Sequence, residues 1–285
     1  SRGFSYSYGF AGSLDMAPYV YVQNDLPTAI PTDTTECVDE KGFWRKGVTG
    51  PDFVHAQVLP HLTEKSVQYI RERTKSGQPY FLYYALPAPH TPILPTTEFL
   101  GKSNTNFYGD FVLQVDDVVG KIVQAVIESG QADNTLIIFT TDNGCSPRAN
   151  FEELRRVGHS PSSIYRGHKA DIYEGGHRVP FVLSWPKGIK GGRVSDEPIC
   201  TTDLMATLAD LLQFRLPDNA AEDSYSLLPI LLGKPHKSPL REAVVHHSIE
   251  GRFAIRQGSW KLILWPGSGG WSHPTTKDLG GKLSG

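Results

Sequence analysis

Long apolar runs, cysteine pairs and an excess of charge of either sign are all scarce in this sequence. Its 285 residues carry 28 Lys and Arg against 30 Asp and Glu, which argues against nucleic acid or an anionic membrane as the main partner. No stretch approaches the ~20 apolar residues that span a bilayer. Three cysteines imply no disulfide framework. No secretory signal is visible, and neither end is typical of a natural terminus, so we expect a fragment and infer no compartment.

Hydrophobic residues make up 39% of the chain and aromatic residues 11%, enough for a sizeable core. Apolar runs and helical periods alternate along the sequence. We expect strands at 80–86 (buried on both faces), 135–140 and 179–185. Helices are expected at 64–75 (capped by Thr63 and ended by Gly77), 111–126 and 201–214 (capped by Thr201 or Thr202). Residues 1–60, without a sustained period, are expected to be loops. The alternation predicts an α/β fold in which a mostly parallel sheet is sandwiched by helices.

The pattern changes after Pro217. Three short segments, "EAVVHHSI", "GRFAIRQG" and "SWKLILW", alternate apolar and polar residues and are separated by glycine-containing turns, which predicts an antiparallel meander. We therefore expect two domains: residues 1–216 as part of the α/β domain, and residues 217–285 as a small, truncated antiparallel α+β subdomain.

The stretch "TTDNGCSPR" begins where the 135–140 strand is expected to end. Ligands of open α/β sheets bind beyond the carboxyl ends of the strands, where Asp142 and Asn143 stand. A carboxylate beside a carboxamide offers hard oxygen donors, which suit Ca²⁺ or Mg²⁺ better than zinc. Asp-Asn-Gly is also good turn chemistry, but no partner strand follows to form the hairpin in which such turns are common. Cys145 next to it is interpreted as a small packed residue rather than a nucleophile.

Further candidate residues lie elsewhere in the chain. His90 lies among four prolines after the 80–86 strand. There it can face the crevice at the carboxyl ends of the strands, as Asp142 does, or form a hydrogen bond with a backbone group. Lys169 precedes Gly175-Gly176, whose glycines permit a sharp reversal, although a solvated surface lysine is the commoner role. His168, Trp44 and Arg45 are weaker candidates for lining a polar substrate, with packing or surface roles as the alternative.

A hard cation, a histidine and a lysine at one rim suit the stabilisation of a tetrahedral oxyanion. The cation and the lysine neutralise charge on the non-bridging oxygens, and the histidine serves the leaving oxygen. The spacing of these residues does not distinguish a phosphate from a sulfate group.

Four stretches resemble the type I, arylsulfatase-like sulfatases of the alkaline-phosphatase superfamily. They are "YALPAPHTP" (84–92), "IIFTTDNG" (137–144), "GHKADIYEGGHRVPFVLSWP" (167–186) and "AIRQGSWKLI" (254–263). The likeness covers most of the chain from about Pro79 onward. It implies that Asp142 and Asn143 are two ligands of a calcium ion, with Mg²⁺ less suited, and that His90 and Lys169 contact the sulfate group.

The family's nucleophile is a formylglycine made from the cysteine of C-x-P-S-R, and no such motif is present. Cys37 is followed by Val-Asp-Glu-Lys, and Cys145 by Ser-Pro-Arg-Ala. The resemblance therefore implies the carboxyl-terminal part of a sulfatase without its amino-terminal formylglycine segment. The parent enzyme would cleave a sulfate ester on a small molecule or glycan, and this chain alone is expected to be inactive.

Three other readings remain open. A phosphodiesterase or phosphonate hydrolase of the same superfamily would differ in nucleophile and metal count. A non-catalytic calcium-binding relative would have lost the cysteine motif. An unrelated α/β domain would place His90, Asp142 and Lys169 far apart. The resemblance implies a periplasmic, secreted or lysosomal location without choosing among them, and the sequence indicates no oligomeric state.

Overall fold

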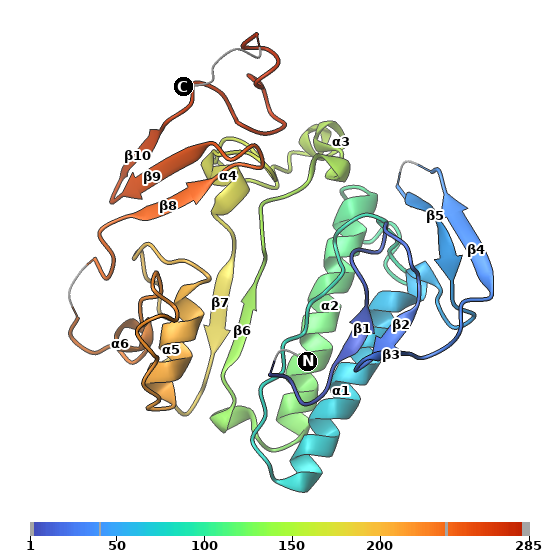
Figure 1. Ribbon diagram of the computed structural model, residues 1–285, viewed down its shortest axis with the longest axis horizontal. Helices are drawn as coiled ribbons and strands as arrows, with labels where there is room; N and C mark the ends of the chain where they lie inside the picture. The colour runs from blue at the N-terminus through green and yellow to red at the C-terminus, as the bar shows by residue number, and fades with distance from the viewer. Residues whose placement is uncertain (1–2, 40, 237–238, 281–285) are drawn as a thin grey trace. The chain divides into compact units, whose positions relative to one another are not determined.

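The structure is a computed structural model that describes residues 3–39, 41–236 and 239–280 (Figure 1). The chain forms two compact units. The first contains residues 1–132 and 146–161, and the second contains residues 133–145 and 162–285. Among the described residues, no helix is both long enough and apolar enough to cross a membrane.

The amino-terminal region of the first unit contains short strands where loops were expected. These strands are β1 (Tyr8–Phe10), β2 (Tyr21–Gln23), β3 (Leu26–Pro27), β4 (Asp33–Cys37) and β5 (Trp44–Thr49). They form two antiparallel sheets, β1-β2-β3 and β4-β5. The expectation of loops was wrong because the longest of these strands has six residues, too few for a sustained alternating pattern.

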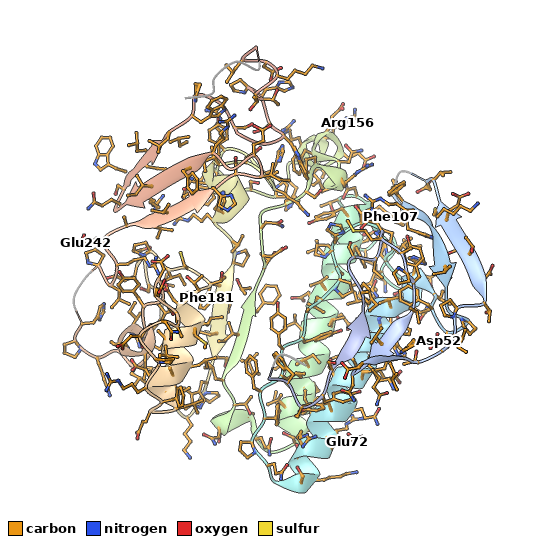
Figure 2. The ribbon with its side chains drawn as sticks, viewed as in Figure 1. Asp52, Glu72, Phe107, Arg156, Phe181 and Glu242 are labelled. Atoms are coloured by element: carbon orange, nitrogen blue, oxygen red, sulfur yellow. The ribbon has the colours of Figure 1, made fainter. Side chains whose placement is uncertain are left out.

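Two long helices pack side by side in the first unit (Figure 1). Helix α1 spans Val58–Ser76 and ends at Gly77, whose left-handed backbone caps it as predicted. The helix begins earlier than expected, so Thr63 lies inside it and donates to the Leu59 carbonyl. Helix α2 spans Phe107–Glu128. Figure 2 shows Phe107 at its beginning and Glu72 near the end of α1.

The core of the first unit has two aromatic and aliphatic clusters. One joins Tyr19, Tyr21 and Phe53 to the start of α1, and the other joins α1 to Phe111 and its neighbours on α2. Short segments complete the unit: the 3₁₀ turns η1 (His55–Gln57) and η3 (Pro147–Ala149), and helix α3 (Phe151–Arg156).

The predicted strand at 80–86 forms no ladder with the described residues. Tyr84 and Leu86 pack against the α1 and α2 cluster, whereas Phe81 and Tyr83 are 62% and 72% exposed. The segment alternates inward and outward side chains as a strand does. The expectation that this segment is buried on both faces was wrong, because the face with Phe81 and Tyr83 is exposed and no described strand pairs with the backbone.

The second unit begins within the 3₁₀ turn η2 (Ala132–Asn134), which precedes the first of two paired strands. These are β6 (Ile137–Thr140) and β7 (Phe181–Ser184), close to the predicted ranges. They pair antiparallel, with Ile137 opposite Ser184. The expected parallel arrangement is therefore not seen in this pair. A parallel pair needs a crossover, usually a helix, and within this unit the connection holds only the four-residue helix α4 (Glu174–His177).

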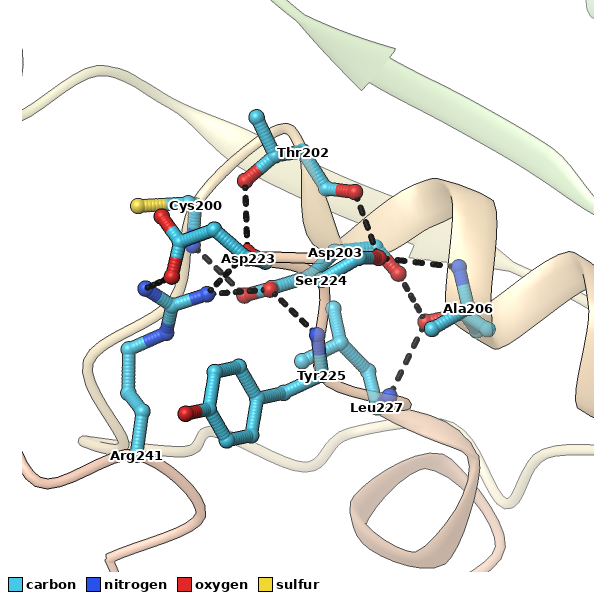
Figure 3. Close-up of polar contacts among 10 residues, drawn as sticks. Cys200, Thr202, Asp203, Ala206, Asp223, Ser224, Tyr225, Leu227 and Arg241 are labelled. Atoms are coloured by element: carbon cyan, nitrogen blue, oxygen red, sulfur yellow. Dashed lines mark hydrogen bonds and ion pairs between the residues drawn. The ribbon is translucent and has the colours of Figure 1, made fainter. Parts of the chain in front are cut away.

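Helix α5 (Asp203–Leu211) begins with a buried ion pair rather than a threonine cap (Figure 3). The Asp203 carboxylate pairs with the Arg241 guanidinium, and both side chains are buried. Asp203 also accepts from the backbone nitrogens of Cys200, at 2.8 Å, and Tyr225, at 2.9 Å. Thr202 occupies the cap position without a side-chain cap bond. The carboxylate therefore holds the loops around the short helix α6 (Leu228–Leu231) onto α5.

The predicted meander is confirmed as an antiparallel sheet of β8 (Val244–His247), β9 (Phe253–Gln257) and β10 (Trp260–Ile263). Figure 2 labels Glu242, just before it. Its inner face packs Ala254 and Ile263 against Ile172 and Tyr173. The predicted domain boundary between residues 216 and 217 falls inside the second unit and stays a prediction.

Candidate functional site

The Asp142 turn follows directly from β6, as predicted. The Asn143 side-chain nitrogen donates to Asp142 Oδ1 at 3.1 Å and to the Gly144 carbonyl at 3.3 Å. Thr141 Oγ1 donates to the Asn143 carbonyl at 3.2 Å. The Asp142 side chain is exposed. These bonds leave a carboxylate and a carboxamide oxygen together at the end of a strand.

The Lys169 turn is bonded directly to the Asp142 turn through the backbone. The Lys169 N–H donates to the Cys145 carbonyl at 2.9 Å, and the Gly144 N–H donates to the Gly176 carbonyl at 3.0 Å. The Gly175 N–H in turn donates to the Arg166 carbonyl at 2.8 Å. The structure therefore brings together three of the predicted site residues: Asp142, Asn143 and Lys169.

Glycines make this close approach of backbones sterically permissible. A Cβ added to Gly144 would lie 1.8 Å from the Gly175 carbonyl oxygen. One added to Gly175 would lie 2.1 Å from the Gly167 carbonyl oxygen, and one on Gly176 would lie 2.5 Å from that of Asp171. Real Cβ atoms do not approach backbone so closely, so these positions require glycine. The glycines of the "YEGG" stretch thus allow the backbone of the Lys169 turn to pack against that of the Asp142 turn.

His168 turns inward rather than outward. Its Nδ1 lies 3.0 Å from the Lys169 carbonyl oxygen and 3.5 Å from Asp171 Oδ2, and its side chain is 13% exposed. These contacts give it a place in the turn that carries Lys169. Its predicted contact with substrate stays a prediction.

Glu174 of the same stretch connects the turn to the meander. Its carboxylate pairs with Arg256 of β9 at 2.8 Å and with Lys261 of β10 at 2.9 Å. Burial opposes ionisation of Glu174, but the hydrogen bond and charge of Lys261, together with Arg256, outweigh it and lower the pKa of the carboxyl. The carboxylate therefore stays charged and holds α4 against both strands.

His90 lies in the first unit, where a chain of polar side chains surrounds it. Its Nδ1 is 2.7 Å from the Thr91 carbonyl oxygen and 3.4 Å from Ser13 Oγ. Because a carbonyl oxygen only accepts, Nδ1 carries the hydrogen in the neutral ring and Nε2 is the nitrogen with the lone pair. Ser13 Oγ donates to Asp15 Oδ1 at 2.6 Å. Arg45 pairs with Asp15 Oδ2 at 2.6 Å.

Asp15 and Ser13 are polar partners of His90 and Arg45 that the sequence reasoning missed. Burial raises the pKa of Asp15, but the Ser13 hydrogen bond and the charge of Arg45 outweigh that effect and leave the pKa below its ordinary value. The "GSLD" stretch holding them lies in a region expected to be loops. The signal that identifies this stretch is its closeness to His90 in space, which the sequence does not reveal.

The side chains of Trp44 and Arg45, both predicted to line a substrate, have different surroundings. The Trp44 ring stacks on His55, with ring centroids 3.9 Å apart, and its indole nitrogen donates to Thr35 Oγ1 at 3.3 Å. Burial lowers the pKa of His55 to about 4. Trp44 is thus held in place by packing, whereas the Arg45 guanidinium is half exposed beside Asp15. Their contact with substrate stays a prediction.

The donor set at Asp142 and Asn143 fits part of a calcium site. Calcium takes six to eight oxygen ligands, including carboxylates and amide carbonyls. Within the described ranges, no group of three or more His, Cys, Asp or Glu side chains is placed to hold a metal ion. None of the three cysteines forms a disulfide with another described residue. The two residues therefore suit a hard cation whose remaining ligands come from other groups.

Comparison with known proteins gives a consistent picture. The model of the family described as Sulfatase matches residues 2–214. The N-acetylgalactosamine-6-O-sulfatase of Bacteroides thetaiotaomicron is 32% identical over 92% of this chain and 58% of that protein. Human steryl-sulfatase is 38% identical over 62% of this chain and 30% of that protein. The chain thus spans less than two thirds of the length of these relatives.

Solved structures agree with the sequence matches. A structure described as concerning the metabolism of multiple glycosaminoglycans by Bacteroides thetaiotaomicron superposes with a TM-score of 0.81 at 30% identity, covering 92% of this chain and 61% of that one. The structure of Ps i-CgsB in complex with k-i-k-neocarrahexaose gives a TM-score of 0.62 at 26% identity, over 86% of this chain and 49% of that one.

Proposed function

The chain belongs to the sulfatase family, and on that premise we propose that it is part of an enzyme that hydrolyses sulfate esters of glycans. The observation that carries the proposal is the backbone bonding of the Lys169 turn to the Asp142 turn. These bonds hold the backbone of the proposed cation ligands Asp142 and Asn143 next to the backbone of Lys169. The name of the Bacteroides relative, an N-acetylgalactosamine-6-O-sulfatase, favours a sulfated amino sugar as substrate.

Each residue has a separate task in the proposed reaction. The Lys169 ammonium group neutralises charge on a non-bridging sulfate oxygen. His90, through Nε2, serves the leaving oxygen as a proton donor once it is protonated. Its part rests on the family resemblance, because it lies in the other unit. Asp142 and Asn143 hold a calcium ion, which supplies positive charge for the sulfate oxygens when it is bound.

We place the formylglycine nucleophile outside these 285 residues, because neither Cys37 nor Cys145 begins the family motif. We also propose that the segment 80–86 is a strand of a larger, mostly parallel sheet. Its exposed Phe81 and Tyr83 support this, as does a strand-like backbone that forms no ladder with the residues that the structure describes. The proposed setting is the periplasm, the extracellular space or the lysosome, as the resemblance implies.

The test is the binding of inorganic sulfate to the 285-residue chain, with and without Ca²⁺, by titration calorimetry. We expect Lys169→Ala to weaken sulfate binding about tenfold, because one charge-assisted contact of ~1.5 kcal/mol is lost. We expect Asp142→Asn to abolish the gain in affinity that Ca²⁺ gives. The chain alone should not turn over an aryl sulfate.

Lys187→Ala is the matched control, because Lys187 is an exposed lysine of the same unit. Equal sulfate affinity in the two lysine variants would contradict the role of Lys169. Turnover of the aryl sulfate that is lost on His90→Ala or Lys169→Ala would show instead that the nucleophile lies within this chain.

A further inference from the structure

Asp171 is a buried carboxylate two residues after Lys169, with 1% of its surface exposed. Its Oδ2 accepts the N–H of His168, the residue directly before Lys169, at 2.9 Å. Its Oδ1 accepts the N–H groups of Trp271, at 2.9 Å, and Ser272, at 3.0 Å. One carboxylate therefore bonds the Lys169 turn to a segment about 100 residues away in the sequence.

The same distant region holds the turn through its backbone. The Ile172 N–H donates to the Ser268 carbonyl at 2.8 Å, and the Ile249 N–H donates to the Ala170 carbonyl at 2.9 Å. Ala170 has φ of 81°, in the left-handed region that a residue with a Cβ rarely adopts. Such a conformation persists only where its surroundings hold it. Lys169 thus lies between His168, whose N–H is bonded to Asp171, and Ala170, whose backbone is left-handed.

The approach of the distant segment is as close as glycine permits. A Cβ on Gly270 would lie 2.5 Å from the Ala170 carbonyl oxygen and 2.7 Å from Asp171 Oδ1. Gly270 therefore allows the 268–272 segment to reach the carboxylate. Since His168 and Ala170 are both fixed, the backbone of Lys169 is fixed on either side, while its own N–H bonds to Cys145.

We propose that Asp171 is a positioning residue for Lys169: its carboxylate clamps the 168–170 turn to the 268–272 segment and thereby directs the ammonium group toward the Asp142 turn. This rests on the proposed function, in which Lys169 binds the sulfate oxygens. The carboxylate itself touches no substrate. Its effect is to reduce the conformational freedom that Lys169 would otherwise lose on binding.

The test uses the 285-residue chain with Asp171→Asn, which keeps the shape of the side chain but removes one acceptor and the charge. Two properties are measured by NMR: hydrogen exchange of the Lys169 amide, and the shift of the Lys169 ammonium signal during titration with inorganic sulfate. We expect at least tenfold faster exchange at Lys169 and about tenfold weaker sulfate binding. In the double variant with Lys169→Ala, the two effects on binding should not add.

Asp203→Asn is the matched control. Asp203 is a carboxylate of equal burial in the same unit that also accepts two backbone N–H groups, and its partners lie outside the Lys169 turn. It should cost stability without changing the ammonium shift or the sulfate affinity. If Asp171→Asn does not fold, Gly270→Ala tests the same clamp from the other side and should give the same two changes.

Different measurements test the sulfate site and the Asp171 clamp. If the unsubstituted chain gives no sulfate-dependent shift at Lys169, the proposed function fails, and exchange at the Lys169 amide alone decides the clamp. Unchanged exchange at Lys169 in Asp171→Asn and Gly270→Ala would overturn the positioning role. Weakened sulfate binding of equal size in Asp203→Asn would do so as well, because it would reduce the effect to general destabilisation.

Discussion

The chemistry of single residues explains why the two turns of the site can meet. Gly144 and Gly175 remove the side chains that would separate them, and Asp171 replaces three water hydrogen bonds with three backbone donors. The sequence predicted Asp142, Asn143 and Lys169 as candidates, because acids, amides and glycines after an apolar run are visible locally. Asp171 was not recognised, because its Trp271 and Ser272 partners lie about 100 residues away.

At the same scale, we predict that the second unit loses stability as the pH falls from 6.5 towards 4. Burial, helped by the charges of Lys261 and His177, lowers the pKa of His246 to about 4, and burial also lowers the pKa of His177. In the unfolded chain both imidazoles take up protons as the pH falls through about 6.5, whereas in the folded unit they stay neutral to lower pH, so acid favours unfolding. Urea unfolding at several pH values should show a loss on the order of 1 kcal/mol, discounted for partial exposure.

His246→Gln should flatten this pH dependence, because one of the two low-pKa imidazoles is removed. The exposed His159 provides the control, and His159→Gln should leave the slope unchanged. A slope in His246→Gln that matches the unsubstituted chain would show that the acid sensitivity arises elsewhere.

Secondary structure elements were predicted where their signal is local. The helical period of α2, the left-handed Gly77 after α1 and the alternation of β8, β9 and β10 all agree with the structure. Elements whose signal is short or depends on partners were missed. The strands before residue 60 are brief, and 80–86 has strand character without a described partner. Helix starts were also displaced, and α2 begins at Phe107 after the Asn106 cap rather than at Phe111.

At the scale of the element, Asn106→Ala should destabilise the first unit by about 1–2 kcal/mol. The Asn106 carboxamide accepts the Gly109 N–H at 3.1 Å and donates to the Ala149 carbonyl at 2.8 Å and to Glu153 at 3.1 Å. It therefore caps α2 and bonds the 146–161 segment at once. Urea unfolding followed by circular dichroism measures the change.

Gln124→Ala is the control on the same helix, since Gln124 is exposed and its side chain donates across one turn to Glu128 at 3.2 Å. It should change the unfolding free energy by a few tenths of a kcal/mol. An equal loss in both variants would mean that the contacts of Asn106 beyond the helix contribute nothing.

The arrangement of the whole molecule was the hardest level to predict. Alternating strands and helices indicated a parallel sheet, but the direction of a strand depends on the path between strands, and β6 and β7 run antiparallel. Exposure was equally hidden from the sequence. Val245, Ile255 and Leu262 stand opposite one another across β8, β9 and β10 and are 58%, 39% and 60% exposed. They form a row, here called the outer row, on the face of the meander away from α4.

At this scale, we predict that the chain binds an apolar fluorescent dye at the outer row, because a contiguous exposed apolar patch attracts apolar ligands. The double variant Ile255→Thr with Leu262→Thr should lose at least half of the dye fluorescence. Hydrogen exchange in the meander should remain protected, since the inner face is untouched and threonine suits a strand.

Ile30→Thr with Val38→Thr is the comparison, because both residues are at least 80% exposed but lie outside the outer row. That variant should retain the dye signal. A similar loss in both variants would assign the binding to scattered apolar residues rather than to the meander.

The bonds from residues 248–272 back to Ala170, Asp171 and Ile172 have a practical consequence for trimming the protein. A version shortened to end before residue 248 would keep every amino acid predicted to touch sulfate. It would nonetheless lose the segment that bonds the Lys169 turn, so weaker sulfate binding in the shortened chain would not by itself indicate misfolding. Residues 248–272 should therefore be kept with the proposed sulfate site when boundaries for expression are chosen.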